Sequence, residues 1–461
     1  MNFEKLLESA GDRTVRVALT GAGDFGSSFL YQALRIKCLD VPVVINRTPS
    51  RAVNAYVAAG VLRDDVAVCE SARTAKKAFE SGKRVVVADS DLIRDLPLDV
   101  LVEGTGHPET GALHAKRAIE SGWHIIMVSK EVDSVVGPEL ASRAIEIGRV
   151  YSPADGDQPS LLIGLISWAR VLGLKILSAG KASEYDFVYD TVRRTITAND
   201  HTIAAERIND LWAHGSLSSV DLVRQRSALL SHLPQRAVPD LCEMGIVANA
   251  TGMKPDTPSF HAPIARVMEV ADFFCPIEMG GLFSGIGKLD IFNCLRKNDE
   301  ASMGGGVFIV VECEDKDTWR ILEKKGHACS RNNQCAMLYH PAHLLGVEAP
   351  MSVLLASCLG IPTGAFSPRP VCDLVGKATR DLPAGFVLEM GGHHHTIEGV
   401  EAQLIDAAPM RPGNPAPFYM IANRRLLRPV SAGSIIMCEG IDIDADSVLA
   451  DLRMAQDKRF F

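Results

Sequence analysis

A glycine-rich run near the N-terminus is the first place where residue types and spacing point to chemistry. The apolar segment 15–20 leads directly into Gly21-Ala22-Gly23-Asp24-Phe25-Gly26, a G-x-G-x-x-G pattern. Gly21 permits a tight turn, Gly23 lets the backbone approach phosphates, and Gly26 lets a helix pack closely on the strand. The helix N-terminus then offers unpaired N–H groups to an anion. We therefore expect a nicotinamide or flavin dinucleotide site here; a glycine turn without a ligand is the alternative.

The next apolar segment predicts which dinucleotide binds. Val43-Val44-Ile45 is expected to be the second strand, and it ends in Asn46-Arg47-Thr48, with Arg51 close behind. An NAD site normally has Asp or Glu at this point, where it accepts a hydrogen bond from the ribose 2′-hydroxyl. A carboxylate is missing here, and a guanidinium can bind a phosphate bidentately. The pattern therefore favours the 2′-phosphate of NADP(H), while arginines that are simply solvated loop charges are the alternative.

Polar residues at other expected strand ends are candidates for the reacting end of the site. Gly104-Thr105-Gly106 and Ser129-Lys130-Glu131 each follow an apolar segment, and Lys181 follows another. Ligands of doubly wound sheets bind at the carboxyl ends of the strands. These groups should therefore line the nicotinamide side of the cleft.

The elements that position these residues alternate between strands and helices. Strands are expected over 15–20, 43–45, 99–103, 124–129 and 149–152, with helices over 109–121 and in the segment before Gly148. This alternation predicts an α/β fold with a Rossmann-type doubly wound parallel sheet in residues 1–155. The longer, more charged segment 62–96 is expected to be an insertion at the edge of the sheet.

A second unit, expected to be an α+β substrate-binding and dimerisation domain, covers residues 156–361. Asp157 should cap a helix that ends at Gly173. Further helices are expected at about 218–232 and from Asp240 to Thr251, and a strand at 307–311. The segment from about 255 to 306 is rich in glycine and is expected to be mostly loop.

Three side chains in this unit have more than one interpretation. Glu243 lies among apolar neighbours, so it either faces solvent or has a partner in the site, because an unpaired buried carboxylate is costly. The small residues of its helix predict close packing against another helix, with a dimer contact as one option. His340 and His343 could ligate a metal if helical, could bind phosphate, or could cap a helix start.

Residues 362–461 are expected to form a small all-β module, because short apolar segments alternate there with Pro/Gly turns. This module contains His393-His394-His395. Adjacent residues of a strand point to opposite faces, so the three imidazoles cannot easily share one metal ion. A solvated loop is the favoured interpretation.

Composition narrows the class of protein. The chain has 461 residues and a formal net charge of −8, which argues against a nucleic-acid partner. It lacks an apolar run of about 18 residues and a signal-peptide pattern at its start, so we expect neither a membrane span nor secretion. Its 11 cysteines are scattered, without a C-x-x-C pair, which favours reduced thiols in a cytoplasmic protein. A small-molecule substrate and a homodimer or homotetramer are expected.

Several of these segments, in this order, resemble homoserine-dehydrogenase-like NAD(P)-binding proteins with a C-terminal SAF-type domain. The resemblance is closest to their 1-deoxy-D-xylulose 5-phosphate reductoisomerase-like branch, and it spans most of the chain. The strings that carry it are the glycine turn 21–26, the polar-plus-Arg end of the second strand, Gly104-Thr105-Gly106, Glu131 and Asp133 with Gly137-Pro138, Gly156-Asp157-x-Pro159, Ser178-Ala179-Gly180-Lys181, Glu243-Met244 with Ala248-Asn249-Ala250-Thr251-Gly252, and His340-x-x-His343 with Glu348-x-Pro350.

This resemblance implies an NADPH-dependent rearrangement and reduction of a phosphorylated ketose to 2-C-methyl-D-erythritol 4-phosphate, a step of isoprenoid precursor synthesis that uses Mg²⁺ or Mn²⁺. Under it, the metal ligands would be Glu131, Asp157 and Glu243, whose oxygens suit such an ion. The phosphate would be bound by Lys181, His340 and His343. Lys130 or Lys181 would protonate the nascent alkoxide.

Other functions remain open on the same residues. A homoserine dehydrogenase-like enzyme, or a dehydrogenase of polyols or sugar acids, would use the same fold. A protein of another class, an NADP-binding sensor or scaffold, would bind the dinucleotide without turning it over. The charged residues Lys181, Asp157 and Glu243 at the expected site favour an enzyme.

Overall fold

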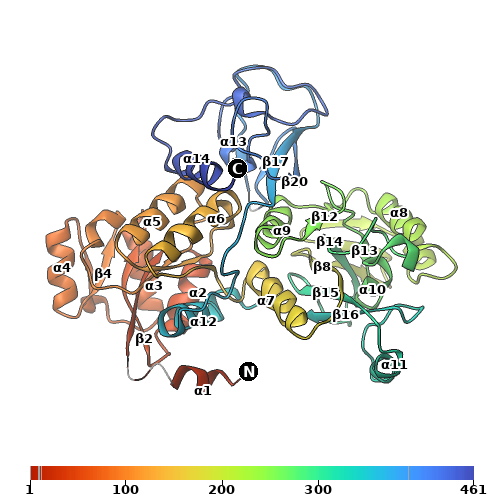
Figure 1. Ribbon diagram of the computed structural model, residues 1–461, viewed down its shortest axis with the longest axis horizontal. Helices are drawn as coiled ribbons and strands as arrows, with labels where there is room; N and C mark the ends of the chain where they lie inside the picture. Colours follow the sequence, from red (N-terminus) through yellow and green to blue (C-terminus); the bar gives the residue numbers. More distant parts are fainter. Residues whose placement is uncertain (1, 9–10, 12, 393) are drawn as a thin grey trace.

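The computed structural model describes residues 2–8, 11, 13–392 and 394–461, and these residues build three β-sheets (Figure 1). In Figure 1 the red and orange elements of the first sheet lie on one side and the green elements of the second sheet on the other. The blue C-terminal segment lies above the junction between them. Among the described residues, none of the helices combines the length and the apolar character needed to cross a membrane.

The first sheet is parallel throughout and has the strand order β3-β4-β2-β1-β5-β6-β7. Its strands are β1 (Val15–Thr20), β2 (Leu39–Ile45), β3 (Val66–Val68), β4 (Arg84–Val87), β5 (Val100–Glu103), β6 (His124–Met127) and β7 (Tyr151–Pro153). The helices that connect them are α2 (Asp24–Ala33), α3 (Pro49–Ala58), α4 (Ala72–Glu80), α5 (Pro108–Glu120) and α6 (Lys130–Glu146). The direction of winding reverses between β1 and β5, which is where such sheets bind nucleotides. The predicted doubly wound α/β sheet is confirmed.

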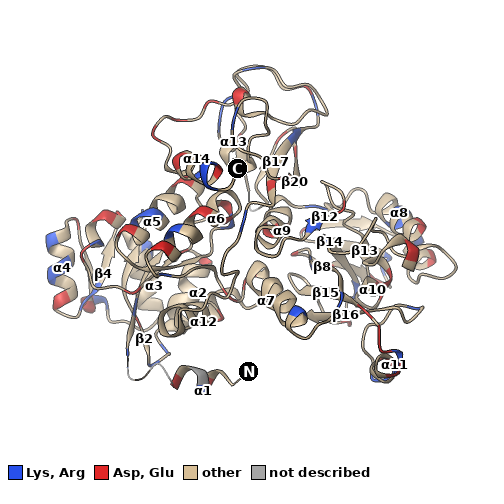
Figure 2. Cartoon of the chain, viewed as in Figure 1, with Lys and Arg blue, Asp and Glu red and all other residues tan. Residues whose placement is uncertain are grey.

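The charged segment 62–96 is part of this sheet rather than an insertion. It supplies β3 and β4, and β4 pairs with β2. Helix α4 between them is capped by Ser71, whose hydroxyl accepts the N–H of Thr74 at 3.2 Å. Charged side chains lie on α4 (Figure 2), whereas the exposed residues Asp89, Asp91 and Asp95, which suggested an insertion, follow β4. The edge position was predicted, but the strands were missed because they are only three and four residues long.

The second sheet is mixed, with the order β11-β10-β9-β14-β8-β15-β16 and two short strands attached to β14. Its strands are β8 (Ile176–Ala182), β9 (Phe187–Asp190), β10 (Thr195–Ala198), β11 (His201–Ala204), β12 (Lys254–Pro255), β13 (Ile264–Ala265), β14 (Lys288–Lys297), β15 (Val307–Glu312) and β16 (Cys335–His340). The accompanying helices include α7 (Gln158–Val171), α8 (Ser219–Leu229), α9 (Val238–Thr251), α10 (Val270–Phe273) and α11 (Lys316–Lys324).

The central strand β14 lies in the segment that was expected to be loop. Its sequence lacks the continuous apolar pattern of a buried strand because the buried polar residues Asp290 and Asn293 interrupt it. Backbone groups pair with part of each side chain: Asp290 accepts the N–H of Ala262 at 3.0 Å, and Asn293 donates to the Ala262 carbonyl at 3.2 Å. The Asn293 Oδ1 atom has no hydrogen-bond partner among the described residues. These bonds let a strand with polar residues occupy the middle of the sheet.

Helix α9 makes the close approach that its small residues predicted, but it does so within the chain. It packs against α6, α7 and the C-terminal segment. A Cβ on Gly245 would lie 3.2 Å from Leu404 of that segment. This surface of α9 is therefore covered and is not available to a second subunit.

The third sheet is the small antiparallel sheet predicted for the C-terminal module, in the order β17-β20-β19-β18. Its strands are β17 (Cys372–Ala378), β18 (Met390–Gly391), β19 (Thr396–Ile397) and β20 (Val400–Asp406), followed by α13 (Phe418–Ile421) and α14 (Val448–Phe460). The terminal helix α14 was not predicted. It packs on α5 and α6, and its first N–H, that of Val448, is bound by Glu109 of α5 at 2.5 Å.

A segment from the predicted second domain returns to the first sheet. Helix α12 (Pro350–Leu354) and the turn before it pack beside α2 (Figure 1). Gly346 lies so close that a Cβ there would be 2.8 Å from Ser28. The division into residues 1–155, 156–361 and 362–461 stays a prediction.

Candidate functional site

The glycine turn has the close contacts that a dinucleotide site requires. A Cβ on Gly21 would lie 2.6 Å from the Gly104 carbonyl, and one on Gly26 would lie 2.1 Å from the Gly21 carbonyl. A Cβ on Gly23 would meet nothing within 4 Å, so the space in front of it is open. Helix α2 begins at the next residue without a side-chain cap, which leaves its first N–H groups for an anion. These residues fit a dinucleotide pyrophosphate.

Side chains of this motif and of the β2 end lie beside the candidate dinucleotide site. Phe25 packs on the next glycine turn, because a Cβ on Gly104 would lie 2.9 Å from its ring. Asp24 is exposed at the start of α2. Asn46 accepts the Ala22 N–H at 3.1 Å and donates to the Thr48 carbonyl at 2.8 Å, so it joins the two loops.

The two arginines beyond β2 have the properties needed for a 2′-phosphate. Arg47 and Arg51 are exposed, and neither forms an ion pair with another described residue. An arginine without a carboxylate partner can bind a phosphate without first breaking an ion pair. Their positive charge at the end of β2 agrees with the predicted NADP(H) preference, which itself stays a prediction.

The loop after β5 is held by the buried carboxylate of Glu103. Thr105 donates to Glu103 at 2.6 Å, and His114 lies 3.4 Å away. Burial alone would raise the pKa of Glu103, but hydrogen bonds from His114, Ser129 and Thr105 outweigh burial and lower it. The Gly106 N–H donates to Ser129 at 2.8 Å. The two predicted strand-end motifs are therefore adjacent.

Two lysines share one carboxylate at the centre of the site. Lys130, the first residue of α6, donates to Glu243 and lies 3.5 Å from Asp157, which caps α7. Lys181 of β8 donates to the other oxygen of Glu243 and, at 2.7 Å, to Asp240. The structure thus brings Lys130, Asp157, Lys181 and Glu243 into one group. We call these residues together with Asp240 the lysine–carboxylate cluster.

The pKa values in the cluster favour charged lysines. Burial alone would raise the pKa of Glu243, but Lys130 and Lys181 outweigh burial and lower it to about 2. Burial alone would lower the pKa of both lysines, but Asp157 and Glu243 raise that of Lys130, and Asp240 and Glu243 raise that of Lys181. Burial raises the pKa of Asp157, with Lys130 opposing it.

The side chains of the two lysines differ in how far they are exposed to solvent. The side chain of Lys130 is 26% exposed, whereas that of Lys181 is 1% exposed. Lys181 is also the sixth residue of β8 rather than a residue beyond its end. Part of the Lys130 side chain is therefore open to solvent, while Lys181 is enclosed beneath Asp240 and Glu243.

The predicted metal ligands are not arranged as a ligand set. Lys130 and Lys181 occupy the oxygens of Glu243, and Asp157 faces Lys130. Across the part of the chain that is described, no group of three or more His, Cys, Asp or Glu side chains could hold a metal ion. The donor set therefore does not fit the divalent cation that the resemblance implies.

The two histidines predicted to bind the phosphate together with Lys181 have different surroundings. His343 is not helical and lies beside the start of α7, with Nδ1 3.3 Å from the Gly156 carbonyl. His340 is the exposed last residue of β16 and lines a separate cavity of ≈ 880 Å³ together with Trp168. Neither histidine caps a helix start.

Glu131, the fifth predicted catalytic residue, lies next to the cluster and meets His395, for which the sequence predicted a solvated loop. His395 of the C-terminal module places Nε2 3.5 Å from the Glu131 carboxylate and Nδ1 2.9 Å from the Tyr419 hydroxyl. His395 is therefore partly buried rather than solvated; His393 lies outside the described residues. Burial raises the pKa of Glu131 to about 7. Its second oxygen has no hydrogen-bond partner among the described residues.

Asp240 and Ser183 were also missed. Ser183 donates to Asp240 at 2.9 Å. Asp240 could have been found, because it precedes Glu243 by three residues and so shares a face of α9. Ser183 follows Lys181 by two residues and His395 belongs to the histidine triplet, but their contacts in the site depend on the tertiary fold.

Asp133 is a second buried carboxylate of α6, two residues after Glu131. Asp133 accepts the Tyr151 hydroxyl at 2.9 Å, and a Cβ on Gly137 would lie 2.0 Å from it. Burial raises the pKa of Asp133 to about 7, although the bond from Tyr151 opposes this.

Comparison with solved structures gives only remote similarity. A dipicolinate-bound dihydrodipicolinate reductase from Paenisporosarcina sp. TG-14 is 11% identical, with a TM-score of 0.33, over 76% of this chain and 97% of that chain. GenD2 from gentamicin A biosynthesis, in complex with NAD, is 14% identical with a TM-score of 0.33, over 76% and 88%. A mutant of KijD10, a 3-ketoreductase from Actinomadura kijaniata, is 16% identical with a TM-score of 0.25, over 39% and 48%. The chain thus spans about half the length of that last protein, and TM-scores this low transfer no function.

The sequence comparisons are more specific. No curated protein matches the chain. Residues 238–349 match the family model described as "Oxidoreductase DRL, catalytic domain". The matched segment begins with α9 and includes Asp240 and Glu243 of the cluster. This segment is therefore similar to an oxidoreductase catalytic domain.

Proposed function

We propose that the protein is an NADP(H)-dependent oxidoreductase that interconverts a carbonyl group and its alcohol at the lysine–carboxylate cluster. The observation that carries the proposal is the place of Lys130. It lies at the start of α6, directly after Ser129 and the dinucleotide-binding edge of the first sheet, and a quarter of its side chain is exposed. It is held there by Glu243 and Asp157 from the second unit.

These residues suit proton transfer to the oxygen of a reacting carbonyl. The dinucleotide, when bound, supplies the hydride that reduces the carbonyl carbon. Lys130, kept protonated by its carboxylate neighbours, donates a proton to the oxygen as alkoxide charge develops there. An alkoxide is more basic than a lysine amine, so the raised pKa of Lys130 does not prevent this transfer. In the direction of oxidation the same proton returns to the Lys130 amine.

Lys181 and Asp240 act on this reaction through Glu243. Lys181 binds one oxygen of Glu243 while Lys130 binds the other, so the carboxylate cannot rotate without breaking an ion pair. Asp240 also accepts a hydrogen bond from Lys181, at 2.7 Å. We propose that both are positioning residues that fix Glu243, and through it the Lys130 ammonium.

We propose two candidate substrates. The cluster supports a small carbonyl compound reduced without a divalent cation, because its carboxylates are occupied by lysines. The reductoisomerase-like reaction on 1-deoxy-D-xylulose 5-phosphate is the second candidate. The observation that favours it is that the matched segment 238–349 contains Glu243, His340 and His343, which also carry the resemblance to that branch.

The test follows NADPH absorbance with the purified full chain. The carbonyl panel contains 1-deoxy-D-xylulose 5-phosphate and hydroxyketones, each with Mg²⁺, with Mn²⁺ and with a chelator. Homoserine, polyols and sugar acids are assayed with NADP⁺. We expect turnover that persists in the chelator. Turnover of the deoxyxylulose phosphate only with metal would instead establish the reductoisomerase-like reaction. Binding of NADPH without turnover of any compound would contradict the proposal and favour a sensor.

A further inference from the structure

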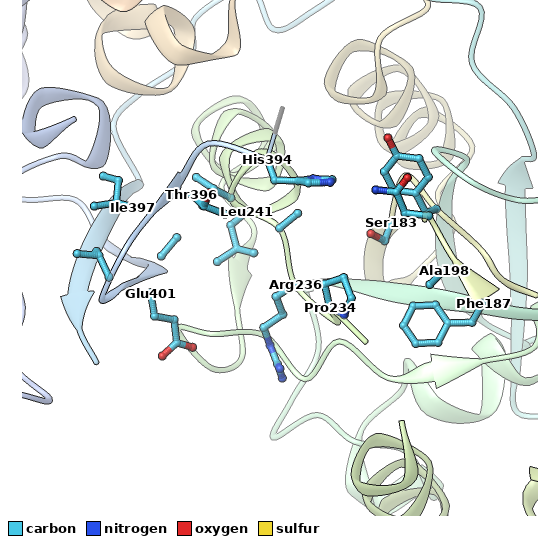
Figure 3. A pocket seen from close by; sticks show the side chains of 16 residues that line it. Ser183, Phe187, Ala198, Pro234, Arg236, Leu241, His394, Thr396, Ile397 and Glu401 are labelled. Carbon is cyan, nitrogen blue, oxygen red and sulfur yellow. The ribbon is translucent and has the colours of Figure 1, made fainter. Parts of the chain in front are cut away.

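An apolar cavity lies between the second sheet and the C-terminal module (Figure 3). Its volume is ≈ 340 Å³. The second unit contributes Phe187 and Leu241 to its lining, and the module contributes Ile397 and Val400. Phe187, Leu241 and Ile397 are almost completely buried, so the cavity has a fixed apolar wall rather than a mobile surface.

The charged groups around this cavity do not suit a phosphate. Arg236 lines it, but its guanidinium donates to the carbonyls of Ser259 at 2.6 Å and Phe260 at 2.9 Å. Glu401 is the acidic residue of the lining, and it disfavours an anion. Lysine is absent from the described lining residues. The chemistry that fits is therefore a neutral, apolar group.

One end of the cavity is polar and adjoins the cluster at Ser183. Ser183 lines the cavity and donates to Asp240, which in turn binds Lys181. His394 also lines it and precedes His395, the residue beside Glu131. In Figure 3 the imidazole of His394 points across the cavity towards Ser183.

From this arrangement we propose that the cavity binds an apolar substituent of the substrate, either an aromatic ring or a branched alkyl group. The reacting carbonyl would then lie beyond the polar end, towards the cluster. A volume of ≈ 340 Å³ is at the small end of the range for ligand pockets, so it suits one ring rather than a whole substrate. The proposal that the ligand is a substrate rests on the proposed function, whereas the binding of an apolar group does not.

Binding is tested with indole, titrated against the full chain by ligand-observed NMR. Val400→Trp fills the cavity from β20. Val192→Trp makes the same change on a surface where the side chain is 90% exposed, and it is the matched control. We expect saturable binding to the wild type and to Val192→Trp, weakened at least about tenfold in Val400→Trp. Thr396→Trp, at the exposed rim, repeats the test if Val400→Trp fails to fold.

Turnover is tested with hydroxyacetone and its benzyl-substituted counterpart. We expect kcat/KM for the benzyl compound to exceed that for hydroxyacetone at least about tenfold in the wild type and in Val192→Trp, and this advantage to be lost in Val400→Trp. Absence of indole binding, or equal binding in all variants, would overturn the cavity as a site. Indole binding that is sensitive to Val400→Trp, without turnover of any carbonyl, would leave the cavity standing and contradict the proposed function. Turnover without the benzyl advantage would support the proposed function and contradict the proposal that the cavity binds a substituent of the substrate.

Discussion

At the scale of single residues, Glu243 determines what the two lysines can do. It binds Lys130 with one oxygen and Lys181 with the other. Because Lys181 is enclosed and Lys130 is partly exposed, only Lys130 is placed to exchange a proton with a bound molecule. Removing Lys181 would leave Asp240 and Glu243 buried with less positive charge, so its loss would act through stability and through the position of Glu243.

The buried carboxylate of Asp133 gives a pH dependence of stability whose sign follows from its pKa. That pKa is raised to about 7 in the folded chain, against about 3.9 for an unfolded aspartate. The folded state thus binds this proton more tightly than the unfolded state. The contribution of Asp133 to stability is therefore largest below about pH 4 and is lost as the pH rises through 7. A shift of this size corresponds to about 4 kcal/mol.

We therefore expect Asp133→Asn to gain thermal stability over the wild type as the pH rises from about 4 to about 8, since an amide oxygen still accepts the Tyr151 hydroxyl. The measurement is the difference in Tm between variant and wild type at each pH. Asp64→Asn is the control, because that carboxylate is exposed and solvent surrounds it in both states. A Tm difference for Asp133→Asn that does not change with pH would show that burial does not perturb this group.

At the scale of elements, we predict that the end of β2 selects the dinucleotide. Arg47 and Arg51 are exposed and form no ion pair with the other described residues, so a 2′-phosphate would gain their charge at little cost. We expect the double variant Arg47→Ala/Arg51→Ala to bind NADPH at least about tenfold more weakly while NADH binding changes little. Fluorescence titration with each dinucleotide measures this. Arg73→Ala on the exposed face of α4 is the control, and an equal loss for both dinucleotides would refute a role in discrimination.

How far the sequence predicted each element depended on whether its signal was local. The strand, glycine turn and α2 lie within twenty residues, and their pattern led to the correct sheet and to the turn geometry. Strand β14 was missed because Asp290 and Asn293 interrupt its apolar pattern, and their partners come from a distant loop. Helix α14 was missed although its start has a local cap, in which the Ser447 hydroxyl accepts the Ala450 N–H at 3.1 Å.

The same distinction applies to the site. Lys130, Glu131, Asp157, Lys181 and Glu243 could be chosen from strand ends and caps, and the structure places them together. Their roles could not be assigned from the sequence. The carboxylates predicted as metal ligands include Glu243 and Asp157, and in the structure these two face lysines instead. His395 depends on how the C-terminal module sits, which no local pattern encodes.

At the scale of the whole molecule, one buried ion pair holds the C-terminal module together. Arg453 of α14 is fully buried and donates to both oxygens of Asp373 on β17, at 2.7 and 2.8 Å. Burial alone would lower the pKa of Arg453, but the Asp373 carboxylate outweighs burial and raises that pKa. Because α14 also packs on α5 and α6, this pair links the module to the first sheet and so supports the position of His395.

Asp373→Ala should therefore destabilise the protein by about 3–5 kcal/mol, because it leaves the Arg453 guanidinium buried with less compensation. Thermal unfolding measures this as a lower Tm or as a separate early transition of the module. Asp406→Ala breaks an ion pair with Lys254 in which the carboxylate is 76% exposed, and it should have little effect. Equal Tm values for the two variants would show that the buried pair does not hold the module.

The central claim is that Lys130 transfers the proton when a carbonyl is reduced with NADPH. The most direct measurement compares wild type and Lys130→Met in NADPH oxidation over the carbonyl panel, with NADPH affinity measured on the same samples. We predict that kcat falls at least about a hundredfold in Lys130→Met while the Kd for NADPH is unchanged. Turnover by Lys130→Met at the wild-type rate would contradict this account.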